Sequence, residues 1–368
     1  MDDTVTTAGD GAAASAAFCS HGADAIWPRR RAMKLGVLQF FSWPERRTAI
    51  ETVYERALQR IEIMDRTGYD AVWLAEHHFH GFSVCPSVHM MGVHVAARTR
   101  RLRIGTAVSL AAFYHPLRLA EEVALLDVLS GGRVNWGAGR GFDRTEFAAF
   151  GVAQEESAPR FQEAVDVVLR AWTEERLTYE GRWFRCADVE VLPKPAQKPH
   201  PPVWLAASSP DAIRRAAAGG FTIMMDPHST HREIAAKREL YRAALETAGG
   251  SIAGRTVPMA RLLAIAPTAR AAEETARRGA QWLVGSYAGP QHQSLSNVIG
   301  FGVAAEGAKV VDPVERYLDG VVVWGTPDAV VDEIARLREE MFLDYLLCAP
   351  LSHESFVLFT DEVLPRIV

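Results

Sequence analysis

The sequence predicts an α/β protein, a (β/α)8 TIM barrel with insertion segments, and three observations support this prediction. Short apolar runs alternate with amphipathic helical stretches from Met33 onward, and eight such runs are present. The runs are apolar on both faces, which is typical of parallel strands covered by helices. Residues 41–44, after the first run, read Phe-Ser-Trp-Pro and lack the glycine-rich turn of a doubly wound nucleotide-binding sheet.

The strand candidates are short and rich in apolar residues. In chain order they are residues 34–41, 71–78, 103–110, 133–139, 203–208, 221–226, 257–266 and 344–349. Helices are predicted at residues 48–67, 87–98, 116–130, 160–174, 210–218, 230–248, 269–284 and 326–340.

The helix predicted at 48–67 shows how these boundaries are chosen. Its apolar side chains recur every three or four residues, at Ile50, Val53, Ala57, Ile61 and Met64. Thr48 and Glu51 fit a capping box at its start, and Gly68 is a helix stop. Pro116 and Thr326 mark the starts of two later helices in the same way.

Three segments depart from the alternation of strands and helices. Residues 176–202 combine turn and aromatic residues with a proline-rich end, which predicts a hairpin followed by an extended linker. Residues 285–310 are rich in glycine, serine and glutamine and predict a long loop of the kind that forms a lid. Residues 1–32 predict a disordered N-terminal extension. Residues 33–368 are therefore predicted to form a single domain with two insertions.

Composition excludes several classes of protein. The net charge of −5 does not favour nucleic acid or an anionic membrane as partner. No apolar stretch reaches the roughly 18 residues that a membrane helix needs. The four cysteines form no C-x-x-C pair, which argues against a zinc site or a redox dithiol. Scattered cysteines in a large chain are typical of the reducing cytoplasm, so we expect a cytoplasmic protein without a metal site.

The active site of a barrel lies at the carboxyl ends of its strands, and the second predicted strand ends in three ionisable residues. Glu76, His77 and His78 suggest a general base with neighbours that orient it and tune its pKa. The alternative is a solvated strand end without chemistry. Adjacent histidines on a strand point to opposite faces, so the two are not expected to ligate one metal.

The fourth and fifth predicted strands end in residues suited to an anion. Arg140 stands between two glycines, which leaves its guanidinium free for a phosphate or carboxylate. The alternative is an ion pair with Asp143 or Glu146. Ser208 and Ser209 precede a helix and offer hydroxyl groups and backbone N–H groups to an anion. The alternative for them is a plain N-cap.

Aromatic residues gather at the same predicted strand ends, which suggests a largely apolar cavity. They are Phe40, Phe41, Trp43, Phe79, Phe113, Tyr114, Trp136 and Phe142. His115 and His228 are further polar candidates of lower weight.

Residues 68–79, Gly-Tyr-Asp-Ala-Val-Trp-Leu-Ala-Glu-His-His-Phe, resemble the signature of the bacterial luciferase-like monooxygenase family. The resemblance continues in order through Gly105-Thr106-Ala107-Val108, His115-Pro116, Ser130-Gly131-Gly132-Arg133 and Gly139-Arg140-Gly141-Phe142. It covers about residues 34–226 and stays in register, more loosely, through the last helix and strand.

The resemblance implies a barrel that is usually dimeric and uses reduced FMN, supplied by a separate NAD(P)H-dependent flavin reductase. Oxygen would add to the flavin C4a position, and the C4a-peroxyflavin would oxygenate a largely apolar organic substrate. His77 matches the catalytic histidine of the family, with Glu76 and His78 as its supports.

The resemblance also assigns residues to the cofactor. Arg140 matches the phosphate-binding arginine. The other cofactor-binding positions are Gly141 and Phe142, which follow it, and Ser208 and Ser209 at a helix N-terminus. Ala107 and Val108 match a pair joined by a cis peptide bond behind the isoalloxazine ring.

Two positions depart from luciferase itself, which argues against light emission. Gly139 stands in place of a reactive cysteine, and Ala207 in place of a glutamate. The alternatives are an F420-dependent oxidoreductase on the same barrel, a non-catalytic flavin-binding homologue, and a metal-dependent barrel hydrolase. The substrate, and the choice among hydroxylation, epoxidation and Baeyer–Villiger oxidation, are beyond the sequence.

Overall fold

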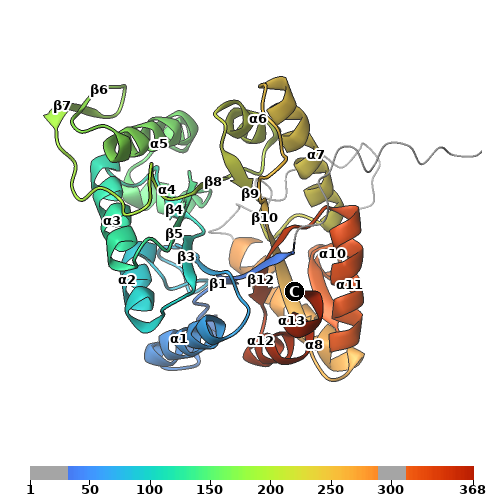
Figure 1. Cartoon of the computed structure of the whole chain (residues 1–368). Helices are drawn as coiled ribbons and strands as arrows, with labels where there is room; N and C mark the ends of the chain where they lie inside the picture. Colours follow the sequence, from blue (N-terminus) through green and yellow to red (C-terminus); the bar gives the residue numbers. More distant parts are fainter. Residues whose placement is uncertain (1–31, 289–311) are drawn as a thin grey trace, which may run out of the picture. The chain divides into compact units, whose positions relative to one another are not determined.

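A parallel sheet forms the centre of the computed structural model, which describes residues 32–288 and 312–368 (Figure 1). The strands follow the order β11-β10-β12-β1-β2-β3-β5-β8-β9, with β4 beside β5. Their bounds are β1 Lys34–Gln39, β2 Ala71–Leu74, β3 Arg103–Thr106, β4 Ser109–Leu110, β5 Val134–Gly139, β8 Val203–Ala206, β9 Thr222–Met224, β10 Pro258–Ile265, β11 Val322–Gly325 and β12 Tyr345–Pro350. Each of the eight predicted strands corresponds to a strand of this sheet.

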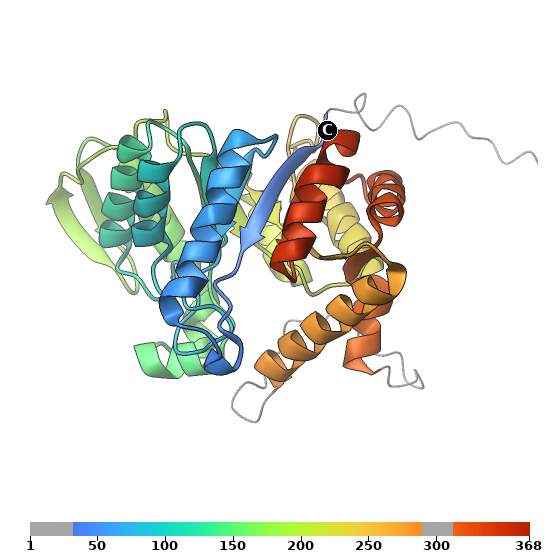
Figure 2. The ribbon, with the colours of Figure 1, turned by 90° about the horizontal axis from the view of Figure 1, so that it is seen from below.

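Helices pack outside the strands, and Figure 2 shows β1 with helices on both sides. The helices are α1 Ile50–Arg66, α2 Val88–Arg98, α3 Pro116–Leu129, α4 Arg144–Phe150, α5 Ser157–Thr173, α6 Pro210–Ala218, α7 His231–Thr247, α8 Ala269–Ala288, α10 Pro313–Gly320, α11 Pro327–Glu340, α12 His353–Leu358 and α13 Leu364–Ile367. In the described part of the chain, none of them has the length and apolar character to cross a membrane.

The sheet is curled, because its β9 end returns to β10. Met225, directly after β9, forms an isolated parallel bridge with Met259 of β10. The N–H of Met225 donates to the carbonyl of Pro258 at 2.9 Å, and the N–H of Ala260 donates to that of Met225 at 3.2 Å. A curled parallel sheet directs the carboxyl ends of its strands toward a common space, where barrel enzymes place their sites.

Two predicted strands end earlier than expected. β2 ends at Leu74, so Glu76, His77 and His78 follow the strand as a loop. The predicted strand 103–110 is divided into β3 and β4, and the peptide bond between Ala107 and Val108 in the gap is cis.

One predicted helix start is wrong. α1 begins at Ile50 with Ala49 as N-cap and without a side-chain cap, so Thr48 and Glu51 form no capping box. A true capping box starts α7. There the N–H of Glu233 donates to the hydroxyl of Thr230 at 3.2 Å, and the N–H of Thr230 donates to the Glu233 carboxylate at 2.7 Å.

The predicted hairpin within 176–202 is confirmed, because β6 (Leu177–Glu180) and β7 (Arg185–Val189) pair antiparallel. The loop predicted at 285–310 begins too early, since residues 285–288 still belong to α8. Residues 289–311 and 1–31 lie outside the described residues, as do the predictions of a lid and of a disordered extension. Helix α10, strand β11 and the helices after β12 were not predicted.

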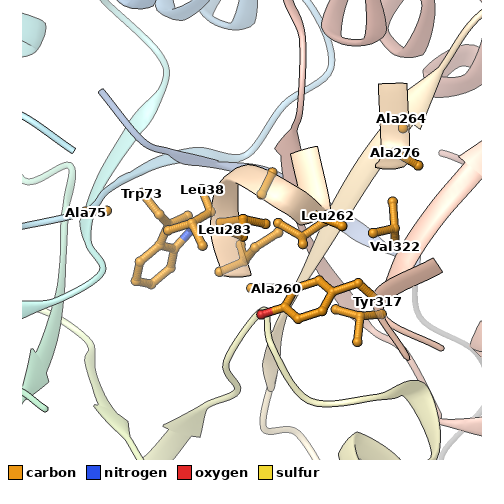
Figure 3. Close-up of a cluster of buried hydrophobic side chains, with 14 of the residues drawn as sticks. Leu38, Trp73, Ala75, Ala260, Leu262, Ala264, Ala276, Leu283, Tyr317 and Val322 are labelled. Atoms are coloured by element: carbon orange, nitrogen blue, oxygen red, sulfur yellow. The ribbon is translucent and has the colours of Figure 1, made fainter. Parts of the chain in front are cut away.

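The side chains inside the sheet form a continuous apolar core (Figure 3). Trp73 of β2 is fully buried there, and its indole N–H donates to the Tyr345 hydroxyl at 3.0 Å. Gly105 of β3 provides the space for this indole, because any Cβ at position 105 would collide with the ring. A buried tryptophan whose N–H is satisfied contributes a large apolar area, and it closes the sheet interior below the site.

Candidate active site

A cavity of about 700 Å³ opens where the strands end. Strands β1, β2, β5, β8 and β9 contribute to it through Phe40, Glu76–His77, Gly139–Phe142, Ala206–Ser209 and Met224–His228. Nine of the ten residues proposed from the sequence line it, namely Glu76, His77, Ala107, Val108, Arg140, Gly141, Phe142, Ser208 and Ser209. His78, the tenth, is not part of the lining.

His77 stands among aromatic rings, and 15% of its side chain is exposed. Its ring centroid lies 5.0 Å from that of Phe82, 6.3 Å from Phe40 and 6.2 Å from Phe142. The backbone N–H of His77 donates to the backbone carbonyl of Cys85 at 3.2 Å. The Nδ1 atom lies 3.7 Å from a carboxylate oxygen of Glu146, which is close enough to orient the ring.

Glu76 and His78 contact each other, and among the described residues the ion-pair partner of the His77 ring is Glu146. The Nε2 atom of His78 lies 3.1 Å from Oε1 of Glu76, and the Tyr114 hydroxyl donates to the same oxygen at 3.0 Å. Burial and the Glu76 charge raise the pKa of Tyr114, so the phenol remains a donor. The Oε2 atom of Glu76 is buried and has no hydrogen-bond partner in the described region.

Glu146 connects the two histidines. Its Oε1 atom accepts the backbone N–H of His78 at 3.0 Å and lies beside His77. The sequence had suggested Glu146 or Asp143 as an ion-pair partner of Arg140. The described residues show no ion pair of Arg140 with either carboxylate, and Asp143 caps α4 by accepting the N–H of Thr145 at 2.7 Å.

Arg140 keeps its charge available. Its Nη1 donates to the Ser157 hydroxyl at 3.0 Å, and its guanidinium forms no ion pair with any described residue. Desolvation and the positive charge of Arg215 lower the pKa of Arg140. Gly141 follows with a φ of 81°, a left-handed conformation that glycine adopts without strain.

The two serines have different partners. Ser209 is the N-cap of α6 and accepts the N–H of Ala212 at 3.3 Å, as in the plain N-cap alternative. Ser208 donates to Oδ2 of Asp226 at 3.3 Å. Ser208 is therefore the hydroxyl of this pair that connects the cavity to the polar residues behind it.

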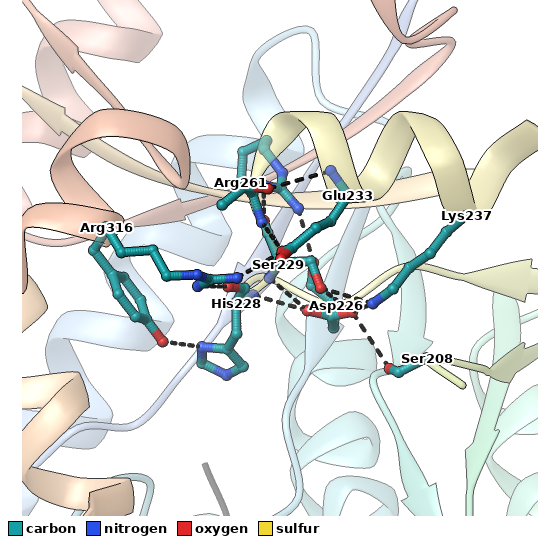
Figure 4. A network of polar contacts seen from close by, with 10 residues as sticks. Ser208, Asp226, His228, Ser229, Glu233, Lys237, Arg261 and Arg316 are labelled. Atoms are coloured by element: carbon teal, nitrogen blue, oxygen red, sulfur yellow. Dashed lines mark hydrogen bonds and ion pairs between the residues drawn. The ribbon is translucent and has the colours of Figure 1, made fainter. Parts of the chain in front are cut away.

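Behind Ser208 lies a buried polar network (Figure 4). Lys237, which is fully buried, donates to Oδ2 of Asp226 and to the Ser229 hydroxyl, both at 2.7 Å. Burial alone would raise the pKa of Asp226, but the charge and hydrogen bond of Lys237 hold it below its usual value. Arg261 donates to the carbonyls of Ser229 and Asp226 at 2.7 and 2.9 Å.

This network fixes His228 in the cavity wall. Its N–H donates to Asp226 at 3.0 Å, and its carbonyl accepts from Arg316 at 3.0 Å. Its Nδ1 atom lies 2.9 Å from the Tyr317 hydroxyl. Burial lowers the pKa of His228 to about 4, so the ring is neutral at pH 7. His228 was only a candidate of lower weight in the sequence, because a single residue after a strand carries no pattern.

Gly139 and Val108 pack closely against each other in the lining of the cavity. A Cβ at Gly139 would collide with the Val108 side chain, so a cysteine does not fit there without rearrangement. Helices α5 and α6 complete the lining with Phe161, Val165, Leu169, Ala212 and Arg215, which the sequence analysis did not identify. Their only sequence signal was membership in helices, which packing against the sheet already explains.

The predicted aromatic cluster is only partly in the cavity. Phe40 and Phe142 line it, whereas Phe41 and Trp136 are fully buried in the core. The other four aromatic residues lie outside the lining, and Phe79 is exposed. Apolar walls, a backbone at Gly139 that carries no side chain, and a guanidinium without a carboxylate partner among the described residues fit a flavin mononucleotide. Among the described residues, no group of three or more His, Cys, Asp or Glu side chains is arranged to hold a metal.

Curated relatives of the chain include two named monooxygenases. An uncharacterized protein of Sinorhizobium fredii is 39% identical over 187 residues, 50% of this chain and 55% of its own length. The oxygenase component of a flavin-dependent trigonelline monooxygenase from Acinetobacter baylyi is 29% identical over 48% of this chain and 49% of its own. Limonene 1,2-monooxygenase from Rhodococcus erythropolis is 29% identical over 77% and 71%. The chain thus spans about half the length of the first two relatives.

Solved structures share the fold. Monooxygenase RslO1 from Streptomyces bottropensis superposes with a TM-score of 0.72 at 28% identity, covering 91% of this chain and all of its own. Two structures at 18% identity show the fold alone. One is the oxygenating constituent of 3,6-diketocamphane monooxygenase of Pseudomonas putida in complex with FMN, with a TM-score of 0.74 over 92% of this chain and 99% of its own. The other is an F420-dependent secondary alcohol dehydrogenase, with a TM-score of 0.70 over 92% of this chain and 100% of its own.

The family model described as luciferase-like monooxygenase matches residues 33–344. That range contains both strand ends that carry His77 and Arg140, and it covers most of the described sheet. The chain therefore belongs to the luciferase-like monooxygenase family.

Proposed function

We propose that the protein is the oxygenase component of a two-component monooxygenase, which uses FMNH2 and O2 to oxygenate a largely apolar organic substrate. The observation that carries this proposal is the content of one cavity. It joins a histidine in aromatic surroundings to an arginine without an acidic partner. A separate observation supports a complete (β/α)8 barrel, since the Met225–Met259 bridge brings β9 back to β10.

Different residues of the cavity would bind the phosphate and the ring system of the cofactor. Arg140 and Ser208 would hold the phosphate. The guanidinium can donate to phosphate oxygens, and the Ser208 hydroxyl would exchange its 3.3 Å hydrogen bond to Asp226 for one to the phosphate. Ser209 would contribute through the N-terminus of α6, which it caps. Ala107, Val108, Gly141 and Phe142 would line the ring system. A reduced flavin held there would supply two electrons for the activation of O2, one atom of which would go to the substrate and the other to water.

His77 would hold or move the proton that this chemistry requires. Its ring borders the cavity, and the carboxylate of Glu146 near Nδ1 favours one tautomer with Nε2 available to accept or return a proton. Aromatic neighbours limit the access of water to the histidine. Exclusion of water would keep activated oxygen from breaking down to hydrogen peroxide before it reaches the substrate. Glu76 and His78 act indirectly by fixing the loop after β2.

The proposal includes partners. A relative is named as an oxygenase component, which supports a separate NAD(P)H-dependent flavin reductase as the source of FMNH2. A homodimer is supported by the exposed apolar side chains of α2 and α3, which are Met90, Val93, Leu125, Val128 and Leu129. The free thiols of Cys85, Cys186 and Cys348 support a cytoplasmic location.

Anaerobic titration with FMNH2 and, in parallel, with reduced F420 tests the cofactor. We expect FMNH2 to bind more tightly, and Arg140→Met to weaken binding about ten- to a hundredfold, the cost of losing a charge-assisted hydrogen bond. Arg144→Met is the matched control, because Arg144 is exposed and outside the cavity lining. Preference for reduced F420 would instead assign the protein to the F420-dependent branch, whose fold it shares. Binding of FMNH2 without turnover in oxygen would indicate a non-catalytic homologue.

A further inference from the structure

A second arginine shares the cavity with Arg140. Arg215 lies on α6, within two turns of the helix start at Ser209, and lines the cavity together with Ser208 and Arg140. The Arg215 side chain has no hydrogen bond or ion pair to any described residue. Its neighbour Arg214 is different. It is paired with Asp211 at 3.1 Å and does not line the cavity.

The two guanidinium groups are close enough to affect each other. The positive charge of Arg215 contributes, after desolvation, to the lowered pKa of Arg140. Two like charges that face one space repel each other unless an anion separates them. An arrangement of this kind, held by two different secondary elements, is typical of an anion site rather than of a stabilising surface.

The acidic residues of the cavity do not neutralise these arginines, because each has another partner. Glu76 binds His78 and Tyr114, and Asp226 binds Lys237. Asp211 binds Arg214. Asp166 lies close enough to Tyr179 that its charge, after burial, raises the pKa of that phenol. The excess positive charge at Arg140 and Arg215 is therefore left for a ligand.

We propose that Arg215 is a second phosphate-binding arginine, and that Arg140 and Arg215 together hold a phosphate monoester as its dianion. This inference rests on the proposed function and assigns a further binding residue to it. A phosphate monoester carries a charge of about −1.5 to −2 at pH 7, so a single guanidinium neutralises only part of it. Two arginines, the Ser208 hydroxyl and the N-terminus of α6 match the full charge.

The consequence is selection for a phosphorylated flavin. Arg215 contributes to binding only when the ligand has the phosphate, so FMNH2 gains from Arg215 and reduced riboflavin does not. Arg215 is exposed to solvent, so salt screens its charge. The contribution of Arg215 to FMNH2 affinity should therefore decrease as ionic strength rises.

The test compares anaerobic binding of FMNH2 and of reduced riboflavin to the full chain and to three variants. Arg215→Met is expected to weaken FMNH2 binding about tenfold, near the lower limit for a charged hydrogen bond because the side chain is exposed. Riboflavin binding should stay within about twofold, which also shows that the cavity is intact. Arg215→Lys should retain part of the FMNH2 affinity, and the control Arg214→Met should retain all of it.

Equal FMNH2 affinity in Arg215→Met and the unchanged protein, while Arg140→Met loses affinity, would overturn the role of Arg215 and leave the proposed function intact. Equal loss of FMNH2 and riboflavin binding in Arg215→Met would also overturn it, since the effect would be structural. If the unchanged protein binds FMNH2 no more tightly than reduced riboflavin, the phosphate site itself is wrong, and the proposed function fails with it.

Discussion

Replacing Lys237 by methionine is expected to destabilise the protein, because it leaves the Asp226 charge buried without its cation. The Lys237 ammonium is fully buried and lies 2.7 Å from a carboxylate of which 12% is exposed. Removing one partner of a buried pair costs about 3–5 kcal/mol. Asp226 keeps the backbone N–H groups of His228 and Ser229, at 3.0 and 2.8 Å, so the lower end of this range applies.

The cost should depend on pH in a defined direction. In the unchanged protein the pKa of Asp226 is below its usual value, so the ion pair stabilises the fold above about pH 4 and loses this effect as pH falls through the lowered value. In the variant, burial without Lys237 raises the pKa of Asp226, and protonation removes the buried charge. The difference in stability should therefore be largest at pH 7 and shrink as the pH approaches 4.

Urea unfolding of both proteins at pH 7 and near pH 4.5 measures this difference. Lys34→Met is the control, since Lys34 lies 3.5 Å from Asp70 with half of its side chain exposed, and surface pairs contribute about 0–1 kcal/mol. A Lys237→Met variant that loses no more stability than Lys34→Met, or whose loss grows on acidification, would refute the reasoning.

Three further predictions concern the cavity wall, acid stability and the outer face. Gly139→Cys should lower FMNH2 affinity and cost about 1–3 kcal/mol in unfolding free energy, because its Cβ collides with Val108; unchanged binding and stability would show that the wall can relax. Acidification from about pH 6.5 to pH 4 should destabilise the fold, because the pKa of His228 is lowered to about 4 and that of His231 to about 3, so the unfolded chain binds more protons there. His228→Gln should flatten this dependence in urea unfolding at several pH values, and an equal slope in both proteins would contradict it. Leu129→Glu should shift the protein from dimer to monomer in light scattering after size exclusion, because Leu129 is 57% exposed on the apolar face of α3; a persisting dimer would place the interface elsewhere.

The positions of eight strands along the chain were predictable, because each is an apolar run bounded by turn or helix signals, whereas β11 at the edge of the sheet was not predicted. The exact ends were less so. Residues 75–78 continue the apolar and polar pattern of β2, but the loop that contains Glu76 and His77 is held by tertiary contacts with Cys85 and Glu146. The start of α1 failed for a related reason, since Thr48 has the right residue type for a cap but lies outside the helix.

The site was predictable where residues follow strands and less so where they lie on helices. His77 and Arg140 each follow a predicted strand, and a curled sheet brings such positions to one cavity. Arg215 lies in the middle of a helix among alanines, where only the three-dimensional arrangement reveals that it lines the same cavity as Arg140. The contacts of His77 and His78 with Glu146 could likewise not be predicted, because Glu146 lies on a helix nearly seventy residues later in the chain.

The most direct test mixes the anaerobic complex of the protein and FMNH2 with oxygen in a stopped-flow spectrometer, and follows flavin oxidation and hydrogen peroxide release. We expect bound FMNH2 to return to oxidised FMN more slowly than free flavin does, and hydrogen peroxide to be released slowly from the unchanged protein. His77→Ala should release peroxide rapidly while binding FMNH2 with little change, and His115→Ala, at an exposed position outside the cavity lining, should behave like the unchanged protein. Oxidation of bound FMNH2 at the rate of free flavin, with immediate peroxide release in the unchanged protein and in both variants, would contradict the assignment as an oxygenase.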